Sequence, residues 1–206
     1  SNATVDSIIT VTRTGGTGSD VTVSDNVSGI GTDQYISVEL INVSGGSGND
    51  IFIVNDDLDN EFNGLGGSDT INYSGVTNPI TATIVSDQAT IQTSGLGIDT
   101  LISIENITTG SGDDTFSFNT DVGTLAIDAG TGNQIYDFNT NVTGTITLTD
   151  GGTTFLDFRD YDDVVDVNLS LTTSQALNSD LSLTLDGTFT NISGSAQNDL
   201  IDGTTN

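Results

Sequence analysis

The chain has 206 residues, of which 29 are acidic and two are basic, so its formal net charge is −27 at pH 7. Such a charge excludes nucleic acid and anionic membrane surfaces as partners, because both would be repelled at ordinary salt concentrations. The sequence has no Cys, which excludes disulfides and thiolate metal sites. Its apolar runs are far shorter than the roughly 20 residues needed to cross a bilayer, so membrane insertion is not expected.

The composition indicates strands and turns instead of helices. Nearly all the acidic residues are Asp, with Glu only at Glu39, Glu61 and Glu105. Asp, Asn, Gly, Ser and Thr favour turns, whereas Ile, Val, Thr, Phe and Tyr favour strands. The sequence therefore predicts an all-β protein.

The predicted elements begin after Ser1, Asn2 and Ala3, which are expected to be a tag remnant on a fragment of a larger protein. Residues 4–206 are expected to form a single domain. Alternating apolar and polar residues predict its strands at 36–43, 51–54, 70–73, 80–85, 89–93, 100–108, 115–119, 144–149, 153–158, 163–169 and 181–185.

Internal repetition organises this domain. The stretch GTDQYISVELINVSGGSGNDIF, from residue 31, is followed from residue 97 by GIDTLISIENITTGSGDDTF. A weaker copy, LSLTLDGTFTNISGSAQNDLIDG, occupies residues 181–203. The repetition divides the domain into imperfect units of about 15–50, 51–118 and 119–203.

The spacing of the glycine-rich turns predicts how these units stack. Asp50 and Asp69 end two such turns, and Asp114 and Gln134 end two more, each pair about 20 residues apart. This is the length of one turn of a solenoid built of short strands. The sequence therefore predicts a right-handed parallel β-solenoid of about ten rungs. An antiparallel β-sandwich remains the structural alternative, because it has strands at similar intervals.

One turn motif carries chemical information. Residues 45–53, GGSGNDIFI, match the pattern GGxGxDxUx, in which U is a large apolar residue. Most of the pattern returns at 64–72 and 109–116, and residues 15–20 keep it through Asp20. On these motifs the chain resembles the haemolysin-type calcium-binding repeats of RTX proteins, in the interrupted form found in large secreted bacterial proteins. The resemblance implies a parallel β-roll that binds calcium.

Calcium is a hard ion that takes six to eight oxygen ligands, and a glycine-rich turn can direct backbone carbonyls toward it. In the family, the Asp at the sixth motif position supplies a carboxylate. The resemblance assigns this role to Asp50, Asp69 and Asp114, and further to Asp20, Asp33, Asp99 and Asp199. The accompanying turn residues are Gly46, Gly48, Asn49, Gly110, Gly112 and Asp113. Turns with Gln134 and Gln197 depart from the pattern and are predicted to be metal-free.

Two further groups of residues have structural interpretations. The stretch DFRDYDDVVD contains Asp157, Asp160, Asp162, Asp163 and Asp166, which fit either another calcium site or a solvated edge with an Arg159 ion pair. The predicted core residues are Phe52, Ile71, Leu101, Ile104, Ile107 and Phe116.

The predicted function is a calcium-binding structural or adhesive module of a larger secreted or cell-surface bacterial protein, and not an enzyme. Its expected partners are calcium ions, neighbouring domains of the parent protein, and a host surface or polysaccharide. A polysaccharide-acting β-helix lyase, hydrolase or epimerase is the alternative, since such folds can display paired carboxylates on one face. The lack of Lys and His disfavours it. An ice-binding solenoid is disfavoured because the Thr residues are not in register.

Overall fold

The computed structural model describes residues 8–13, 21–25, 32–35, 40–55, 58–86, 88–93, 97–140 and 142–203, with side chains from Asn42 onward. The predictions made for residues 1–3 and for Asp20 lie outside the described residues. Asp33 is described only as backbone within a strand.

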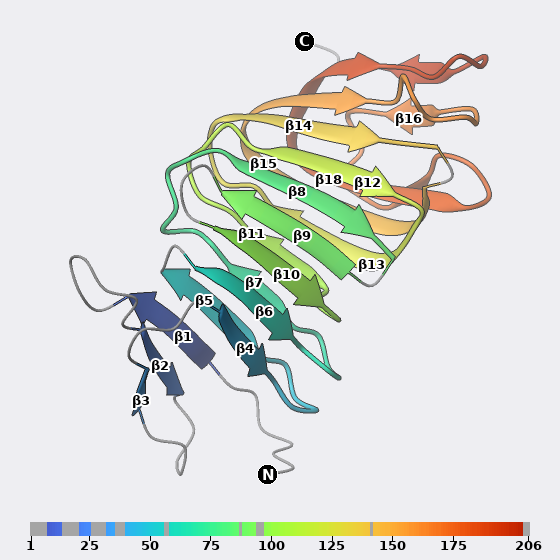
Figure 1. Ribbon diagram of the computed structural model, residues 1–206. Helices are drawn as coiled ribbons and strands as arrows, with labels where there is room; N and C mark the ends of the chain where they lie inside the picture. The colour runs from blue at the N-terminus through green and yellow to red at the C-terminus, as the bar shows by residue number, and fades with distance from the viewer. Residues whose placement is uncertain are drawn as a thin grey trace.

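The described residues form strands and turns and no helix, so none of them forms a helix that could cross a membrane (Figure 1). The strands are β1 (Ile8–Arg13), β2 (Val21–Asp25), β3 (Thr32–Tyr35), β4 (Leu40–Ser44), β5 (Ile51–Asn55), β6 (Asp59–Asn63), β7 (Thr70–Asn72), β8 (Ile80–Val85), β9 (Gln88–Thr93), β10 (Ile98–Ile102), β11 (Asn106–Thr108), β12 (Thr115–Asn119), β13 (Asp121–Asp128), β14 (Asn133–Phe138), β15 (Thr143–Asp157), β16 (Asp166–Asn168), β17 (Gln175–Ala176), β18 (Leu181–Ser193) and β19 (Leu200–Asp202).

Within the described part of the chain, one curled, mostly parallel sheet contains 17 strands, and β16 and β19 form a separate parallel pair (Figure 1). This arrangement confirms the prediction of an all-β protein. It is not an antiparallel sandwich. Antiparallel pairing is restricted to β1–β2–β3, to β8–β9–β10 and to the short β17 against β18.

Successive segments of the chain lie in register on top of one another. One ladder runs β5–β7–β11–β13 and continues through the first halves of β15 and β18. A second ladder runs β8–β12–β14 and continues through the second halves of the same two strands. Each pass of the chain therefore adds one coil to the stack.

The steps between coils are unequal. The hydrogen bond from Asp50 to Asp69 spans 19 residues and that from Asp114 to Gln134 spans 20, whereas that from Asp69 to Glu105 spans 36. The longer step contains the β8–β9 hairpin, and a second long step, between β15 and β18, contains β16 and β17. The predicted period of about 20 residues holds between some coils only, and the pairings do not confirm ten rungs.

The coils enclose an apolar interior. Of the predicted core residues, Phe52, Ile71, Leu101, Ile107 and Phe116 are at most 1% exposed, and Ile104 is partly buried against the core. Aromatic rings stack from coil to coil. The Phe138 ring centroid lies 4.8 Å from that of Phe118 and 4.2 Å from that of Phe158. The parallel register produces these columns, because it places inward side chains directly above one another.

Several strands differ from those predicted. The expected strand 100–108 is two strands, β10 and β11, separated at Ser103, whose φ is 51°. The strands β6, β13 and β14 were not predicted, although each pairs on both sides with neighbouring coils. In β6, with the sequence DNEFN, this pairing outweighs a low intrinsic strand propensity.

We expect Phe138→Ala to lower the free energy of unfolding by about 3–5 kcal/mol, because the cavity interrupts an aromatic column. The matched control is Ile135→Ala on the same strand, where the side chain is 39% exposed. Its loss should stay below about 1 kcal/mol. Urea denaturation followed by circular dichroism measures both, and equal losses would contradict this packing.

Candidate functional site

The glycine-rich turns stack at two corners of the coil. The first corner consists of residues 45–50, 64–69 and 103–105, joined by hydrogen bonds from the Gly66 N–H to the Gly46 carbonyl at 3.2 Å and from the Gly64 N–H to the Ile102 carbonyl at 3.0 Å. The second corner consists of residues 74–79, 109–114, 129–134 and 149–154. The motif copies are thus divided between two edges.

Acidic side chains connect the coils of the first corner. Asp50 braces its own turn, since its Oδ2 accepts the Gly46 N–H at 2.6 Å. The Asp50 N–H in turn donates to Asp69 Oδ1 at 2.7 Å, and the Asp69 N–H donates to Glu105 Oε2 at 2.7 Å. The carboxylates of Asp69 and Glu105 therefore each cap a backbone amide of the preceding coil. Glu105 was not among the predicted site residues, because the 36-residue step moves it away from the 20-residue spacing.

Asp69 has one carboxylate oxygen without a partner among the described residues. The residue is 1% exposed, and its Oδ2 makes no hydrogen bond. Burial raises the pKa of Asp69 to about 6, against the lowering effect of the Asp50 N–H, and the nearby charges of Glu105 and Asp50 raise it further. An unpaired, desolvated carboxylate oxygen at this place would be stabilised by a cation or a proton.

The first glycine of the motif makes room for this carboxylate. A Cβ added at Gly64 would lie 2.2 Å from Asp69 Oδ2 and 2.2 Å from the Ser103 carbonyl oxygen. The same relation recurs between Gly45 and Asp50 Oδ2 at 2.3 Å. The side chain of the Asp at the sixth motif position therefore lies over the glycine at the first position. Any side chain at that glycine would displace the Asp carboxylate.

The second corner has the same arrangement with mixed chemistry. Asp114 accepts the Ile80 N–H at 2.8 Å and the Thr109 hydroxyl at 2.6 Å, and burial raises its pKa. The Asp114 N–H donates to Gln134 Oε1 at 2.7 Å, and the Gln134 amide donates to the Ala129 carbonyl at 3.1 Å. An uncharged Gln thus connects two coils as Asp does elsewhere.

The remaining predicted acidic residues lie apart from the first corner. Asp99 is buried, and its carboxylate accepts the Asn60 N–H at 2.9 Å and the Tyr73 hydroxyl at 2.7 Å. Asp199 accepts the Val165 N–H at 2.9 Å within the separate turn near β19.

The predicted turn residues also connect neighbouring coils. Asn49 Oδ1 accepts the Ser68 N–H at 2.8 Å, and the exposed Asp113 accepts the Asn133 N–H at 2.8 Å. Gly46, Gly48, Gly110 and Gly112 lie where their backbones approach those of adjacent turns. These residues therefore hold the stacked turns of each corner together.

The polar groups at the first corner offer only oxygen atoms as metal ligands. No group of three or more acidic residues that could hold a metal ion is present in the part of the chain that the structure describes. The unpaired Asp69 Oδ2 and the Ser103 carbonyl oxygen nevertheless approach the same point beside Gly64. With no Cys or His in the sequence, this all-oxygen set suits a hard cation.

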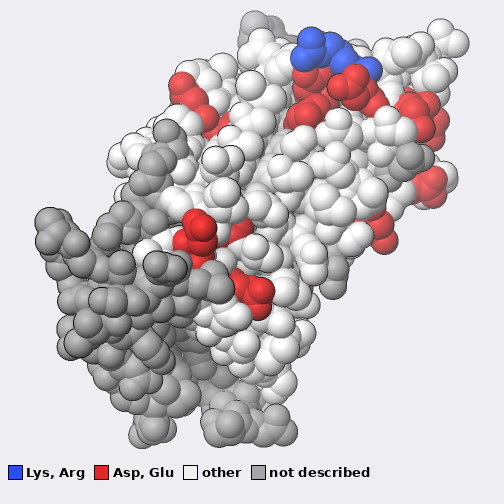
Figure 2. All heavy atoms as spheres, viewed as in Figure 1, with Lys and Arg blue, Asp and Glu red and all other residues white. Residues whose placement is uncertain are grey.

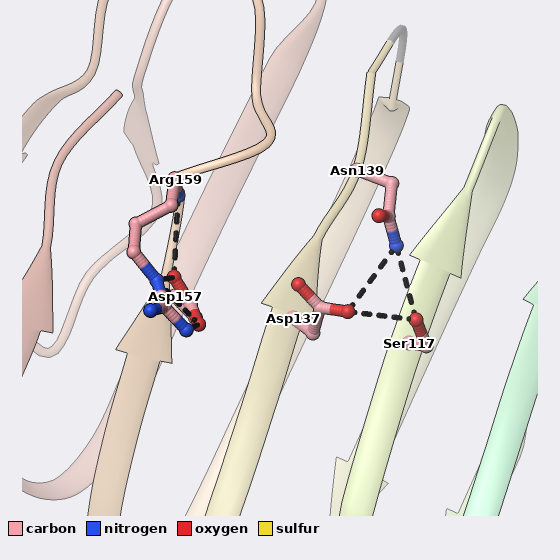
Figure 3. Close-up of polar contacts among 5 residues, drawn as sticks. All are labelled: Ser117, Asp137, Asn139, Asp157 and Arg159. Carbon is pink, nitrogen blue, oxygen red and sulfur yellow. Dashed lines mark hydrogen bonds and ion pairs between the residues drawn. The ribbon is translucent and has the colours of Figure 1, made fainter. Parts of the chain in front are cut away.

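A second polar group lies on the outer face of β12, β14 and β15 (Figures 2 and 3). Arg159 Nε donates to Asp157 Oδ1 at 2.8 Å and Nη2 contacts the other oxygen, so the pKa of Asp157 is lowered. The Arg159 ion pair considered for this acidic stretch therefore forms, with Asp157 as its partner. Beside it, Asp137 accepts the Ser117 hydroxyl at 3.0 Å, and Asn139 Nδ2 donates to the same hydroxyl at 3.0 Å.

Comparison with known proteins adds no assignment. No protein-family model matches the sequence, and no curated protein matches it significantly. The resemblance to RTX repeats therefore depends on the turn motifs alone.

We expect Gly64→Ala to lower the free energy of unfolding by about 2 kcal/mol or more, because its Cβ collides with a carboxylate and with backbone that cannot move freely. Gly66→Ala in the same turn is the matched control, since nothing lies within 4 Å of its added Cβ. Thermal unfolding measures both, and similar losses would contradict the described position of Asp69.

The raised pKa of Asp69 predicts that, without calcium, the chain is more stable to unfolding at mildly acidic pH than at neutral pH. Between about pH 4 and pH 6 the folded state binds more protons than the unfolded state, so the free energy of unfolding falls as pH rises through this window. The contribution of Asp69 should be about 1–2 kcal/mol. Asp69→Asn, compared with the unchanged chain by urea denaturation from pH 4 to 7, should have a flatter profile. Parallel profiles would contradict this assignment.

Proposed function

We propose that this chain is a calcium-binding structural module, a right-handed parallel β-solenoid of RTX-like type, belonging to a larger secreted or cell-surface bacterial protein. The observation that carries the proposal is the buried, unpartnered Asp69 Oδ2 at a corner of stacked motif turns. The large negative charge supports it, because a compact fold with a net charge of −27 gains from bound cations.

The groups that would face the ion at the first corner are the Asp69 carboxylate and the Ser103 carbonyl. The charges of Asp50 and Glu105 lie nearby. A bound calcium ion would supply the positive charge that this corner lacks. Asp50 and Glu105 both raise the pKa of Asp69, so the three groups repel one another in their ionised forms. Neutralising that repulsion would favour the stacked corner over its separated turns.

Calcium binding of this kind would make folding depend on the calcium concentration around the protein. A ligand that binds only the folded state stabilises it increasingly as its concentration exceeds the dissociation constant. Extracellular calcium would therefore favour the folded coil, and the low calcium of a cell interior would leave the carboxylates in mutual repulsion. In this proposal the folded coil acts as a spacer or adhesive surface, with neighbouring domains and a host surface or polysaccharide as partners.

The outer face does not favour the enzymatic alternative. Asp137 and Asp157 lie opposite each other on adjacent strands, an arrangement that a pair of catalytic carboxylates can take. A general acid, however, needs a raised pKa, and Arg159 lowers the pKa of Asp157. This direction supports a binding module over a glycoside-cleaving site.

The proposal predicts that calcium raises the thermal midpoint of the chain. At a calcium concentration 100 times the dissociation constant, the gain of about 2.7 kcal/mol corresponds to roughly 5–10 °C in a chain of this size. Asp69→Asn should lose a large part of this rise, because the amide removes the charge that faces the ion. Circular dichroism melting in calcium, in magnesium and in excess chelator is the measurement.

The control variant is Asp202→Asn, at an exposed residue of β19. It should keep the full calcium response. Identical melting curves in calcium and chelator would refute the proposed function, and an equal loss in both variants would refute the assignment of the site.

A further inference from the structure

Three buried polar atoms near the second corner have no hydrogen-bond partner among the described residues. They are the Tyr136 hydroxyl, Thr154 Oγ1 and Asp150 Oδ2. Tyr136 and Thr154 are 0% exposed and Asp150 is 7% exposed. Leaving one such group unpaired in a protein interior costs about 1–3 kcal/mol, so three together require an explanation.

The three residues lie on adjoining strands. Tyr136 belongs to β14, and Asp150 and Thr154 lie in β15, four residues apart across the turn at residues 151–153. The β14–β15 register places Gln134 opposite Thr154, so Thr154 and Tyr136 are inward-facing neighbours, one alternation apart. Asp150 is the nearby charge with the largest effect in raising the pKa of Tyr136, after burial itself. By register, Asp150 and Thr154 occupy the same places in their turn as Thr109 and Asp114, whose side chains are hydrogen-bonded at 2.6 Å.

Aromatic rings border this environment on both sides. The Phe116 ring stacks on Tyr136 with a centroid distance of 5.2 Å. Phe189 pairs in register with Thr154, and its ring centroid lies 6.5 Å from that of Tyr136. Tyr136 and Thr154 are therefore isolated from bulk solvent.

The side chain that braces the second corner differs between the two neighbouring coils. Gln134 occupies the bracing position and reaches the Asp114 N–H in the preceding coil and the Ala129 carbonyl in its own turn. In the next coil that position is Thr154, whose side chain is too short to make both contacts. Thr154 is smaller than Gln134, and the Asp150 carboxylate lies in the same turn, where its Oδ1 accepts the Gly152 N–H at 3.1 Å.

We propose that Tyr136, Asp150 and Thr154 bind one internal water molecule. Tyr136 and Thr154 donate to it, and it donates to Asp150 Oδ2. A buried water typically makes two to four hydrogen bonds to otherwise unsatisfied polar groups, which is the number offered here. The site is independent of the calcium proposal and would replace the Gln bridge by a solvent bridge.

The test is the sign of the stability change in Tyr136→Phe, measured in excess chelator. If a water is bound, the Tyr136 hydroxyl stabilises the fold through a hydrogen bond to it. Removing the hydroxyl should then lower the thermal midpoint by about 3–5 °C. If the hydroxyl is unpaired, its burial destabilises the fold, and the same variant would melt at a higher temperature than the unchanged chain. Tyr73→Phe is the matched control, because the Tyr73 hydroxyl donates to Asp99 at 2.7 Å and its loss must be destabilising.

A second measurement keeps the proposal falsifiable if the variant folds poorly. A high-resolution crystal structure of the unchanged chain should contain one density peak within hydrogen-bond distance of all three side chains. Thr154→Val should weaken that peak and lower the midpoint. A higher midpoint in Tyr136→Phe, no peak, or a peak with five or more oxygens at metal distances would overturn the proposal.

Because the measurements are made in chelator, their outcome does not depend on the calcium proposal. Failure of the internal water would leave the calcium response of the first corner unchanged. A missing calcium response would likewise leave the interior site unaffected.

Discussion

The fold depends on a hydrogen bond between a buried acidic or amide side chain and the backbone N–H of the preceding coil. It occurs from Asp50 to Asp69, from Asp69 to Glu105, from Ile80 to Asp114 and from Asp114 to Gln134. Each bond satisfies an amide that a tight turn withdraws from the sheet ladders, which a buried backbone group requires. The glycine at the start of the motif is a consequence, because the bracing side chain occupies the space above it.

This bracing has an electrostatic cost that differs between the corners. The first corner uses three carboxylates in succession. Burial raises the pKa of Asp69 to about 6, and the charges of Glu105 and Asp50 add to this rise. The second corner follows Asp114 with the neutral Gln134, so the next bracing side chain adds no charge. Cation binding and side-chain neutrality are therefore two solutions to the same problem, and the proposed calcium site lies where the neutral solution is absent.

The sequence was sufficient to predict an all-β chain, the inward Phe52, Ile71 and Phe116, and the turns ending at Asp50, Asp69 and Asp114. These follow from local composition and from a spacing near 20 residues. Glu105 could not be predicted from spacing, because the β8–β9 hairpin lengthens the step before it. The strands β6, β13 and β14 were missed for a related reason, since their stability comes from pairing with residues distant in sequence.

The two long steps, through β8–β9 and through residues 158–180, leave the alignment of the coils on either side intact. Because the stacked turns hold the coils in register, a longer segment between two turns does not shift the strand pairing. Related sequences could therefore gain or lose segments such as the β8–β9 hairpin or residues 158–180 by insertion or deletion, and the stacked coils would keep their diameter. We call these two segments side branches. Length polymorphism should then concentrate in these branches, while the corner hexapeptides retain a fixed size.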